Sequence, residues 1–163
     1  MTPLECAQGI AAYLREQIAA YGEQNETIAS DTSGESTETY HVYAGFLPYV
    51  KTRAEQKALC PAIVVRPLEV NDEAEESTTL LGVYVTTYDE DKEIGSYGLY
   101  HLLEFIRLRI LEGDPIAEKW RIKPGTLTTS VPDDQPYPQW WGRLDFAVYI
   151  PKPRNLPRKG IIP

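Results

Sequence analysis

The stretch "QPYPQWWGRLDFAVYI", residues 135–150, joins a turn rich in proline to a regular alternation of residue types. Successive side chains of a β-strand point to opposite faces, so this alternation assigns each residue to one of two faces. The stretch therefore predicts a central antiparallel strand with one face on the core and the other on solvent or a partner. The expected core face is Gly142, Leu144, Phe146, Val148 and Ile150, and the expected other face is Trp141, Arg143, Asp145, Ala147 and Tyr149.

The adjacent tryptophans of this stretch must point to opposite sides of the strand. One of them can anchor the core, and we expect the outward one to be Trp141. An outward tryptophan needs a cover, which can be a loop, the C-terminal segment or another subunit. The candidate interface residues are Tyr137, Trp141, Tyr149, Arg154, Arg158 and Lys159.

Two amphipathic helices are predicted from apolar residues at three- and four-residue steps. The first covers residues 3–21, with Leu4 to Tyr21 as its apolar stripe, a capping-box pattern of Thr2 and Glu5, and Gly22 as its end. The second has a stripe made of Leu99, Leu102, Leu103, Ile106 and Ile110, and Gly113, Asp114 and Pro115 follow it as a stop signal.

The remaining segments read as strands and connections. Residues 23–39 are polar and predict a loop, or an edge strand around Thr27–Ala29 followed by a loop. Residues 39–50 read as a strand, and residues 51–59 as a solvated connector or one helical turn. The run 61–70 predicts a strand with Pro67 at an edge or a bulge, joined by an acidic turn to a strand over residues 81–87. Two more strands lie between residues 120 and 150.

The predicted fold class is α+β, with a mostly antiparallel sheet of four to five strands and two main helices packed on it. The order of elements is α-β-β-(β)-α-β-β. Residues 1–151 form a single domain of ordinary size, and residues 152–163 form a basic, proline-rich tail.

Charge is distributed unevenly along this chain of 163 residues, which has a net charge of −8. The tail has four basic residues and no acid, so the other 151 residues hold twelve bases against 24 acids. An acidic body disfavours duplex binding, and the tail is expected to lie along an acidic neighbouring surface. The sequence predicts neither a signal peptide nor a membrane span, and no cofactor, so we expect a cytoplasmic protein.

Few residues suggest a metal-binding or catalytic site. Asp89, Asp91 and Glu93 have the alternate spacing of a Ca²⁺ loop, but Ile94 and Tyr100 stand where an EF-hand requires glycine and glutamate. We therefore expect a solvated loop whose acids precede the second helix and are favoured by its dipole. A small metal-dependent hydrolase that uses these three acids stays open as an alternative.

The cysteines and histidines form no motif in the sequence. Cys6 and Cys60 are expected to be core residues without a disulfide, although a Cys–His pair with His41 or His101 stays open. The chain has no nucleophile elbow, P-loop or dinucleotide fingerprint. The sequence therefore predicts no catalytic residue.

Three stretches give the chain a resemblance to a known family. They are "CPAIVVRPLEV", "TTYDEDKEIGSYGLYHLLEFIRLRILE" and "PYPQWWGRLDFAVYIPKP", within residues 60–153. In length, element order and these stretches the chain resembles the tail terminator, or tail completion, proteins of long-tailed bacteriophages and prophages. The last stretch contains the P-x-x-x-G pattern of that family, here from Pro138, followed by alternating apolar residues.

The resemblance implies a structural role without catalysis. Such a protein forms a hexameric ring that docks on the tail tube protein, stops tube growth and presents a face to a head completion protein. DNA would pass the ring lumen without specific binding, which suits an acidic body. The expected locations are the bacterial host cytoplasm during assembly and the tail or neck of the virion. Another head–tail joining protein of the neck and an unspecified binding module are the alternative structural readings.

Overall fold

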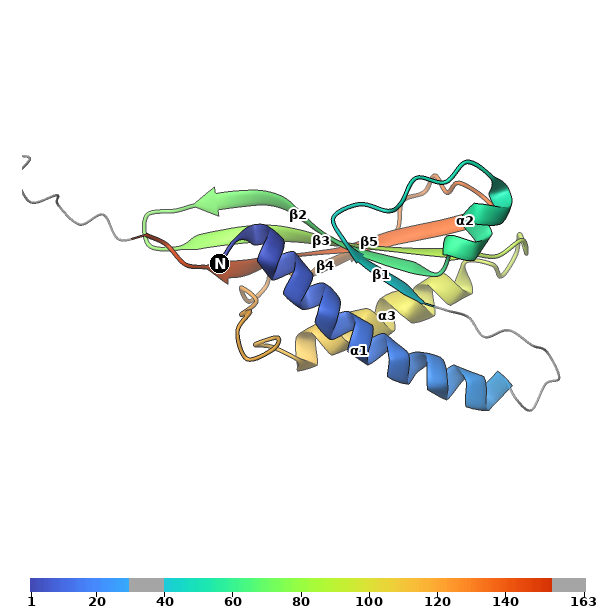
Figure 1. Ribbon diagram of the computed structural model, residues 1–163, viewed down its shortest axis with the longest axis horizontal. Coiled ribbons are helices and arrows are strands. Elements are labelled where there is room, and N and C mark those ends of the chain that lie inside the picture. Colours follow the sequence, from blue (N-terminus) through green and yellow to red (C-terminus); the bar gives the residue numbers. More distant parts are fainter. Residues whose placement is uncertain (30–39, 154–163) are drawn as a thin grey trace, which may run out of the picture.

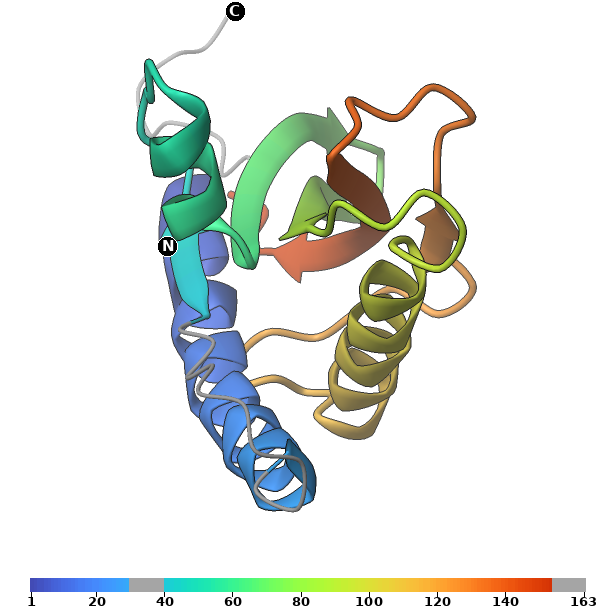
Figure 2. The same ribbon diagram turned by 90° about the vertical axis from the view of Figure 1, so that its right-hand side faces the viewer.

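A computed structural model describes residues 1–29 and 40–153, with the side chains of residues 22–29 left out of the description. The fold is α+β, as predicted: a mostly antiparallel five-stranded sheet is covered by helices on one face. Figure 1 and Figure 2 show helices α1 (Pro3–Ala29) and α3 (Tyr97–Glu112) packed below the sheet. The short helix α2 (Arg53–Leu59) lies on the opposite side, near one end of the sheet.

The sheet has the strand order β1-β2-β3-β5-β4. Strand β5 (Gln139–Ile150) is central, as predicted, and pairs antiparallel along its whole length with β3 (Ser77–Tyr88). The short strand β4 (Thr128–Ser130) lies on the other side of β5. The predicted alternation is confirmed, because the core-facing residues Leu144, Phe146 and Val148 are all 0% exposed.

Helix α1 begins as predicted, with Pro3 in its first turn and reciprocal hydrogen bonds between Thr2 and Glu5. The prediction that Gly22 ends it was wrong, because the helix continues to Ala29, and the suggested edge strand at Thr27–Ala29 was wrong for the same reason. A glycine inside a helix costs only about 1 kcal/mol, and the glutamates and glutamine that follow favour a helix. Residues 30–39 lie outside the described part of the chain.

The inner sides of both helices form the core with the sheet. All five residues of the predicted α3 stripe are buried, and the helix ends at Gly113 as predicted. In α1, Leu4 is 50% exposed and the buried side begins at Cys6 instead. Gly142 of β5 lets α3 approach closely, since a Cβ there would lie 2.8 Å from Leu103 Cδ1. The main core cluster thus lies on the helical side of the sheet, while Ala62 and Val64 are buried on the other face.

Strands β1 (His41–Ala44) and β2 (Ala62–Asp72) form the one parallel pair among the described strands. The connector predicted at 51–59 contains a complete helix, α2, because Thr52 and Glu55 form a capping box. A crossover of this length lets β1 return parallel to β2, whereas a tight turn would force an antiparallel pair.

The predicted hairpin of β2 and β3 is confirmed, and its turn is shorter than the expected loop because β2 extends to Asp72 and β3 begins at Ser77. The register shifts between Pro67 and Glu69, so the predicted bulge at Pro67 is present. Strand β1 pairs with β2 only as far as Val65. Pro67 therefore also lies where β2 has become an edge strand.

Candidate functional site: the outer face of the sheet

The face of the sheet opposite α1 and α3, here called the outer face, contains a row of stacked side chains. Its members come from β2, β3, β5 and the loop after β1, and they are Arg66, Tyr84, Trp141 and Phe46. The Arg66 guanidinium lies 3.9 Å from the ring centre of Phe46 and 4.6 Å from that of Tyr84. The rings of Tyr84 and Trp141 stack at 6.2 Å with a 24° angle between their planes. We call these four residues the outer ladder.

The outer ladder is held in place by backbone contacts. Arg66 Nε donates a hydrogen bond to the Gly45 carbonyl at 2.8 Å, which fixes the guanidinium between its two rings. Gly82 of β3 leaves room for the Tyr84 ring, since a Cβ at that position would lie 2.9 Å from Tyr84 Cε2. Each exposed cation–π contact stabilises by about 0.5–1 kcal/mol, so the ladder orders the surface more than it stabilises the fold.

The two tryptophans point to opposite faces, and Trp141 is the outer one, as predicted. Trp140 packs against the core, and its Nε1 donates a hydrogen bond to the Asp89 carbonyl at 3.0 Å. Gly95 is needed in this loop, because a Cβ there would lie 2.2 Å from the Asp91 carbonyl oxygen and 3.0 Å from Trp140 Nε1. Trp140 therefore ties the acidic loop to the core, while Trp141 shapes the outer face.

The Gln135 side chain forms two bonds with the backbone of Trp141. Its Oε1 accepts a hydrogen bond from Trp141 N at 2.7 Å, and its Nε2 donates to Trp141 O at 3.0 Å. The amide group thus takes the place that a peptide group of a neighbouring strand would occupy. Sequence reasoning missed this role, because the turn around Gln135 shows only its prolines as a signal.

The predicted interface residues do not form one cluster. The Tyr137 hydroxyl donates to the Glu90 carbonyl at 2.5 Å, so this ring lies over the acidic loop rather than over Trp141. Tyr149 lies eight residues along β5 from Trp141, which separates them by about 26 Å along the strand. Arg154, Arg158 and Lys159 lie outside the described residues. Sequence reasoning missed Phe46, Arg66 and Tyr84, although the alternation of β3 placed Tyr84 on the outer face.

The acidic loop uses its carboxylates to hold its own backbone. Asp91 Oδ1 accepts hydrogen bonds from the backbone of Glu93 at 2.8 Å and of Ile94 at 3.1 Å, and Asp89 Oδ1 accepts one from Asp91 N at 2.9 Å. The bonds from Ile94 and Glu93 lower the pKa of Asp91 below its usual value. Across residues 1–29 and 40–153, no three His, Cys, Asp or Glu side chains gather in a way that could hold a metal ion. These hydrogen bonds orient the acids toward the turn before α3.

The cysteines occupy different environments. Cys6 is fully buried, and burial raises the pKa of its thiol to about 12. The Cys60 sulfur lies 2.9 Å from Thr86 Oγ1, and the pKa of Cys60 is raised mainly by burial and lowered less by this contact. Both shifts keep the thiols protonated near neutral pH, which opposes nucleophilic chemistry. Both cysteines are free, as expected.

The chain was compared with protein-family models and with curated proteins. No protein-family model matches the chain, and a search of the curated proteins finds no match either. In the described part of the chain, none of the helices combines the length and the apolar character that crossing a membrane requires.

Proposed function

We propose that this chain is a structural subunit of a bacteriophage or prophage tail, of the tail terminator type, that assembles with copies of itself into a ring. The ring would cap the tail tube, contact the tube protein on one side and a head completion protein on the other, and catalyse no reaction. It would form in the bacterial host cytoplasm and remain in the tail or neck of the virion.

The observation that carries the proposal is the outer ladder on the face of the sheet that α1 and α3 do not cover. Phe46 is 75% exposed although it stacks on Arg66, and Tyr49 in the same loop is 86% exposed. Aromatic residues and arginine are the side chains most enriched at the centres of protein interfaces. An ordered row of them on a sheet face fits contact with another protein better than it fits a solvent-facing surface.

The charge distribution supports the same proposal. The body of the chain carries twelve more acidic than basic residues outside residues 152–163. A ring built from such subunits repels DNA in its lumen, so DNA passes without binding. A subunit that contacts its neighbours through two different surfaces forms a closed ring when the rotation between neighbours closes.

The native mass of the purified chain over a concentration series tests this proposal. We expect a species of six chains of 18.4 kDa, which is roughly 110 kDa. Phe46→Ser should raise the protein concentration needed for half-maximal assembly by about tenfold or more, because an interface aromatic at a hot spot contributes about 2 kcal/mol.

Tyr49→Ser is the matched control for loss of an exposed aromatic side chain. Tyr49 is 86% exposed and is not a member of the outer ladder, so this variant should assemble at the concentration that the native chain needs. A stable dimer as the largest species would contradict the ring. If Phe46→Ser assembles at the concentration that the native chain needs, the outer ladder is not part of the interface.

A further inference from the structure

The edge of β2 that points away from β3 has no neighbouring strand over more than half of its length. Strand β1 pairs with β2 from Ala62 to Val65, and no other described strand lies on that side. The part of β2 beyond Val65, residues 66–72, is here called the open edge. It presents two exposed apolar side chains, Leu68 at 39% and Val70 at 47%. Unpaired strand edges of this kind are the usual template for pairing with another chain.

The pattern of the hairpin determines which backbone groups of the open edge face outward. Glu73 N donates to the Glu76 carbonyl at 2.8 Å, so this pair is a hydrogen-bonded pair of the antiparallel ladder. Such pairs alternate along the strands, which directs the backbone groups of Asn71 and Glu69 toward β3. The N–H and C=O groups of Val70 and Asp72 therefore point away from the sheet. Pro67 contributes no N–H at all.

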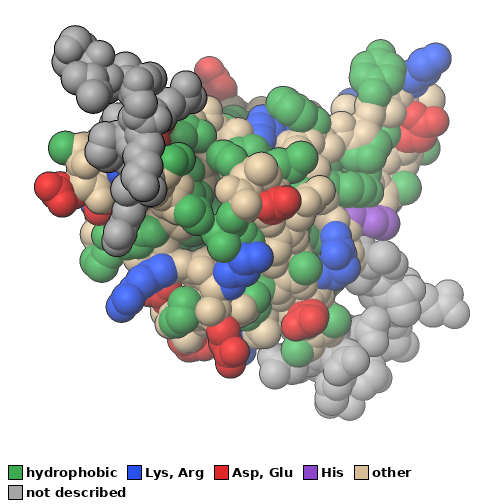
Figure 3. Space-filling view, turned by 60° about the vertical axis from the view of Figure 1, so that its left-hand side comes forward, with side chains coloured by type: hydrophobic (Ala, Val, Ile, Leu, Met, Phe, Trp, Pro, Cys, Tyr) green, Lys and Arg blue, Asp and Glu red, His purple; other side chains and the backbone are tan. Residues whose placement is uncertain are grey.

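The open edge and the hairpin turn are acidic. Glu69, Asp72, Glu73, Glu75 and Glu76 all lie within residues 69–76, which contain no basic residue. Figure 3 shows the side of the molecule with this hairpin, where hydrophobic side chains lie in small groups among charged ones.

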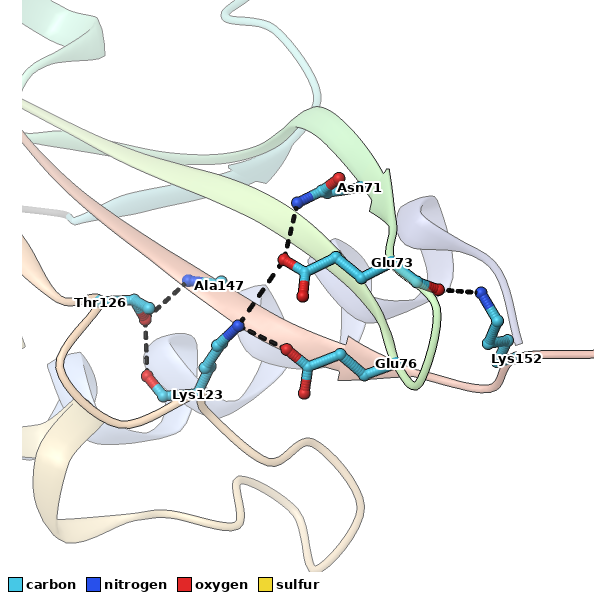
Figure 4. Close-up of polar contacts among 7 residues, drawn as sticks. All are labelled: Asn71, Glu73, Glu76, Lys123, Thr126, Ala147 and Lys152. Carbon is cyan, nitrogen blue, oxygen red and sulfur yellow. Dashed lines mark hydrogen bonds and ion pairs between the residues drawn. The ribbon is translucent and has the colours of Figure 1, made fainter.

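Two lysines already contact the hairpin turn from elsewhere in the chain. Figure 4 shows Lys123 Nζ directed at the carboxylates of Glu76, at 2.5 Å, and Glu73, at 4.0 Å. Lys152 Nζ donates a hydrogen bond to the Glu73 carbonyl. The turn therefore attracts basic side chains, and the segment that follows β5 starts beside it.

We propose that residues 154–163 of a second copy of this chain lie along the open edge as an added strand. This segment, "RNLPRKGIIP", has three basic residues and no acid, and it contains Leu156, Ile161 and Ile162 as partners for exposed Leu68 and Val70. Ten extended residues reach about 33 Å, whereas the open edge is about 23 Å long. Prolines are compatible with an added edge strand where their nitrogen faces solvent.

A second copy fits better than the chain's own segment. Lys152 is held at the turn on the β5 side, so residues 154–163 of the same chain would have to reverse direction around the turn to reach β2. A neighbour's segment needs no reversal. This inference rests on the proposed self-assembly: each copy would donate a basic segment and accept another on β2, a contact of unlike surfaces that can close a ring.

Two full-length variants separate the donor from the acceptor. Val70→Pro removes an outward N–H that the hairpin does not use, and Val70→Thr is its matched control with that N–H retained. The triple variant R154E/R158E/K159E reverses the charge of the donor segment and touches no described contact. We expect both Val70→Pro and the triple variant to lose assembly at concentrations where Val70→Thr and the native chain assemble.

Mixing the two defective variants is the decisive measurement. The triple variant keeps an intact edge and Val70→Pro keeps an intact basic segment, so the mixture should form a complex of about twice the 18.4-kDa chain. No complex in the mixture would mean that the segment binds its own chain or binds nothing, and either overturns the inference. Far-UV circular dichroism and a thermal melt check that Val70→Pro is folded.

The outcomes keep this inference distinct from the proposed function. If the native chain and both variants form the same ring, the ring stands and the open edge is not its contact. If the native chain stays monomeric, the ring fails, and binding of a synthetic peptide of residues 152–163 to the triple variant still tests the edge. We then expect Val70→Pro in that background to weaken peptide binding by about tenfold relative to Val70→Thr. Equal binding would overturn the inference.

Discussion

The two sides of this sheet, along β5 and along β2, differ in whether the backbone groups that point away from β3 have hydrogen-bond partners. Along β5 they are satisfied by three successive partners: the Gln135 side chain at Trp141, strand β4 at Arg143–Asp145, and residues 121–126 at Ala147 and Tyr149. Along β2 the pairing stops at Val65, and the strand continues to Asp72 without an outer neighbour. The closed side needs three separate pieces of the segment that precedes β5, within residues 121–135, whereas the open edge needs only that β1 be short.

The open edge still has features that discourage indiscriminate pairing. Pro67 removes a donor, the bulge between Pro67 and Glu69 bends the strand, and Glu69 and Asp72 add negative charge. An edge with these features repels most strands, and acidic ones above all. The inferred edge contact should therefore favour a basic partner, which is the character of residues 152–163.

The largest expected difference between the two sides comes from proline in either strand. Ala147 N donates to Thr126 Oγ1 at 3.1 Å, so Ala147→Pro should lower the free energy of unfolding by about 3 kcal/mol. Val70→Pro removes an N–H without a partner in the monomer, and its loss should stay below about 1 kcal/mol. Urea unfolding at a protein concentration below assembly measures both. Similar losses would show that the two sides do not differ.

A smaller loss of stability is expected at Trp141, where the side chain of Gln135 is the hydrogen-bond partner of the β5 backbone in place of a strand. Gln135→Leu leaves both backbone groups of Trp141 without their partner and should lower the free energy of unfolding by about 1–3 kcal/mol. Gln135→Glu is the matched control, since its carboxylate still accepts from Trp141 N but cannot donate to Trp141 O. Its loss should be the smaller of the two, and the reverse order would contradict the role of Gln135 as a ladder partner.

The smallest effect concerns the ion pair that joins the closed side to the hairpin turn. The hydrogen bond from Lys123 to Glu76 raises the pKa of Lys123 above its usual value of 10.5. Because the folded-state pKa is the higher one, this contribution is full below about pH 10.5 and is lost as the pH rises through the folded-state value. Lys123→Met should thus be less stable than the native chain at pH 8, with a difference that shrinks above pH 10.5.

Denaturant unfolding at pH 8, 10 and 11.5 checks this prediction. Lys119→Met is the control, because Lys119 lies over the Trp120 ring and affects a carboxylate, that of Glu5, only as the smallest of the causes that lower its pKa. A difference between native and Lys123→Met that stays constant up to pH 11.5 would show that the ion pair does not contribute.

Much of the fold could be predicted from local sequence patterns. The wrong predictions also have local causes. The stripe from Leu99 to Ile110 and the alternation from Gly142 to Ile150 were predicted residue by residue, because both depend only on the period of one element. Gly22 was misread as a helix end, since glycine ends a helix only when the chain turns there. The outer ladder was not predicted beyond Trp141, because Phe46, Arg66 and Tyr84 come from separate elements.

By itself the sequence determined which face each residue of β5 presents, where α1 begins, the buried stripe of α3, and the split between an acidic body and a basic segment. These depend on helical and strand periods and on counted charges, which are local quantities. Only the tertiary structure decided that Gln135 would take the place of a strand beside Trp141, that the pairing of β1 with β2 would stop at Val65, and that an acidic edge would remain open. Backbone hydrogen bonds between strands join residues far apart in the chain, so their partners follow from packing and not from periodicity.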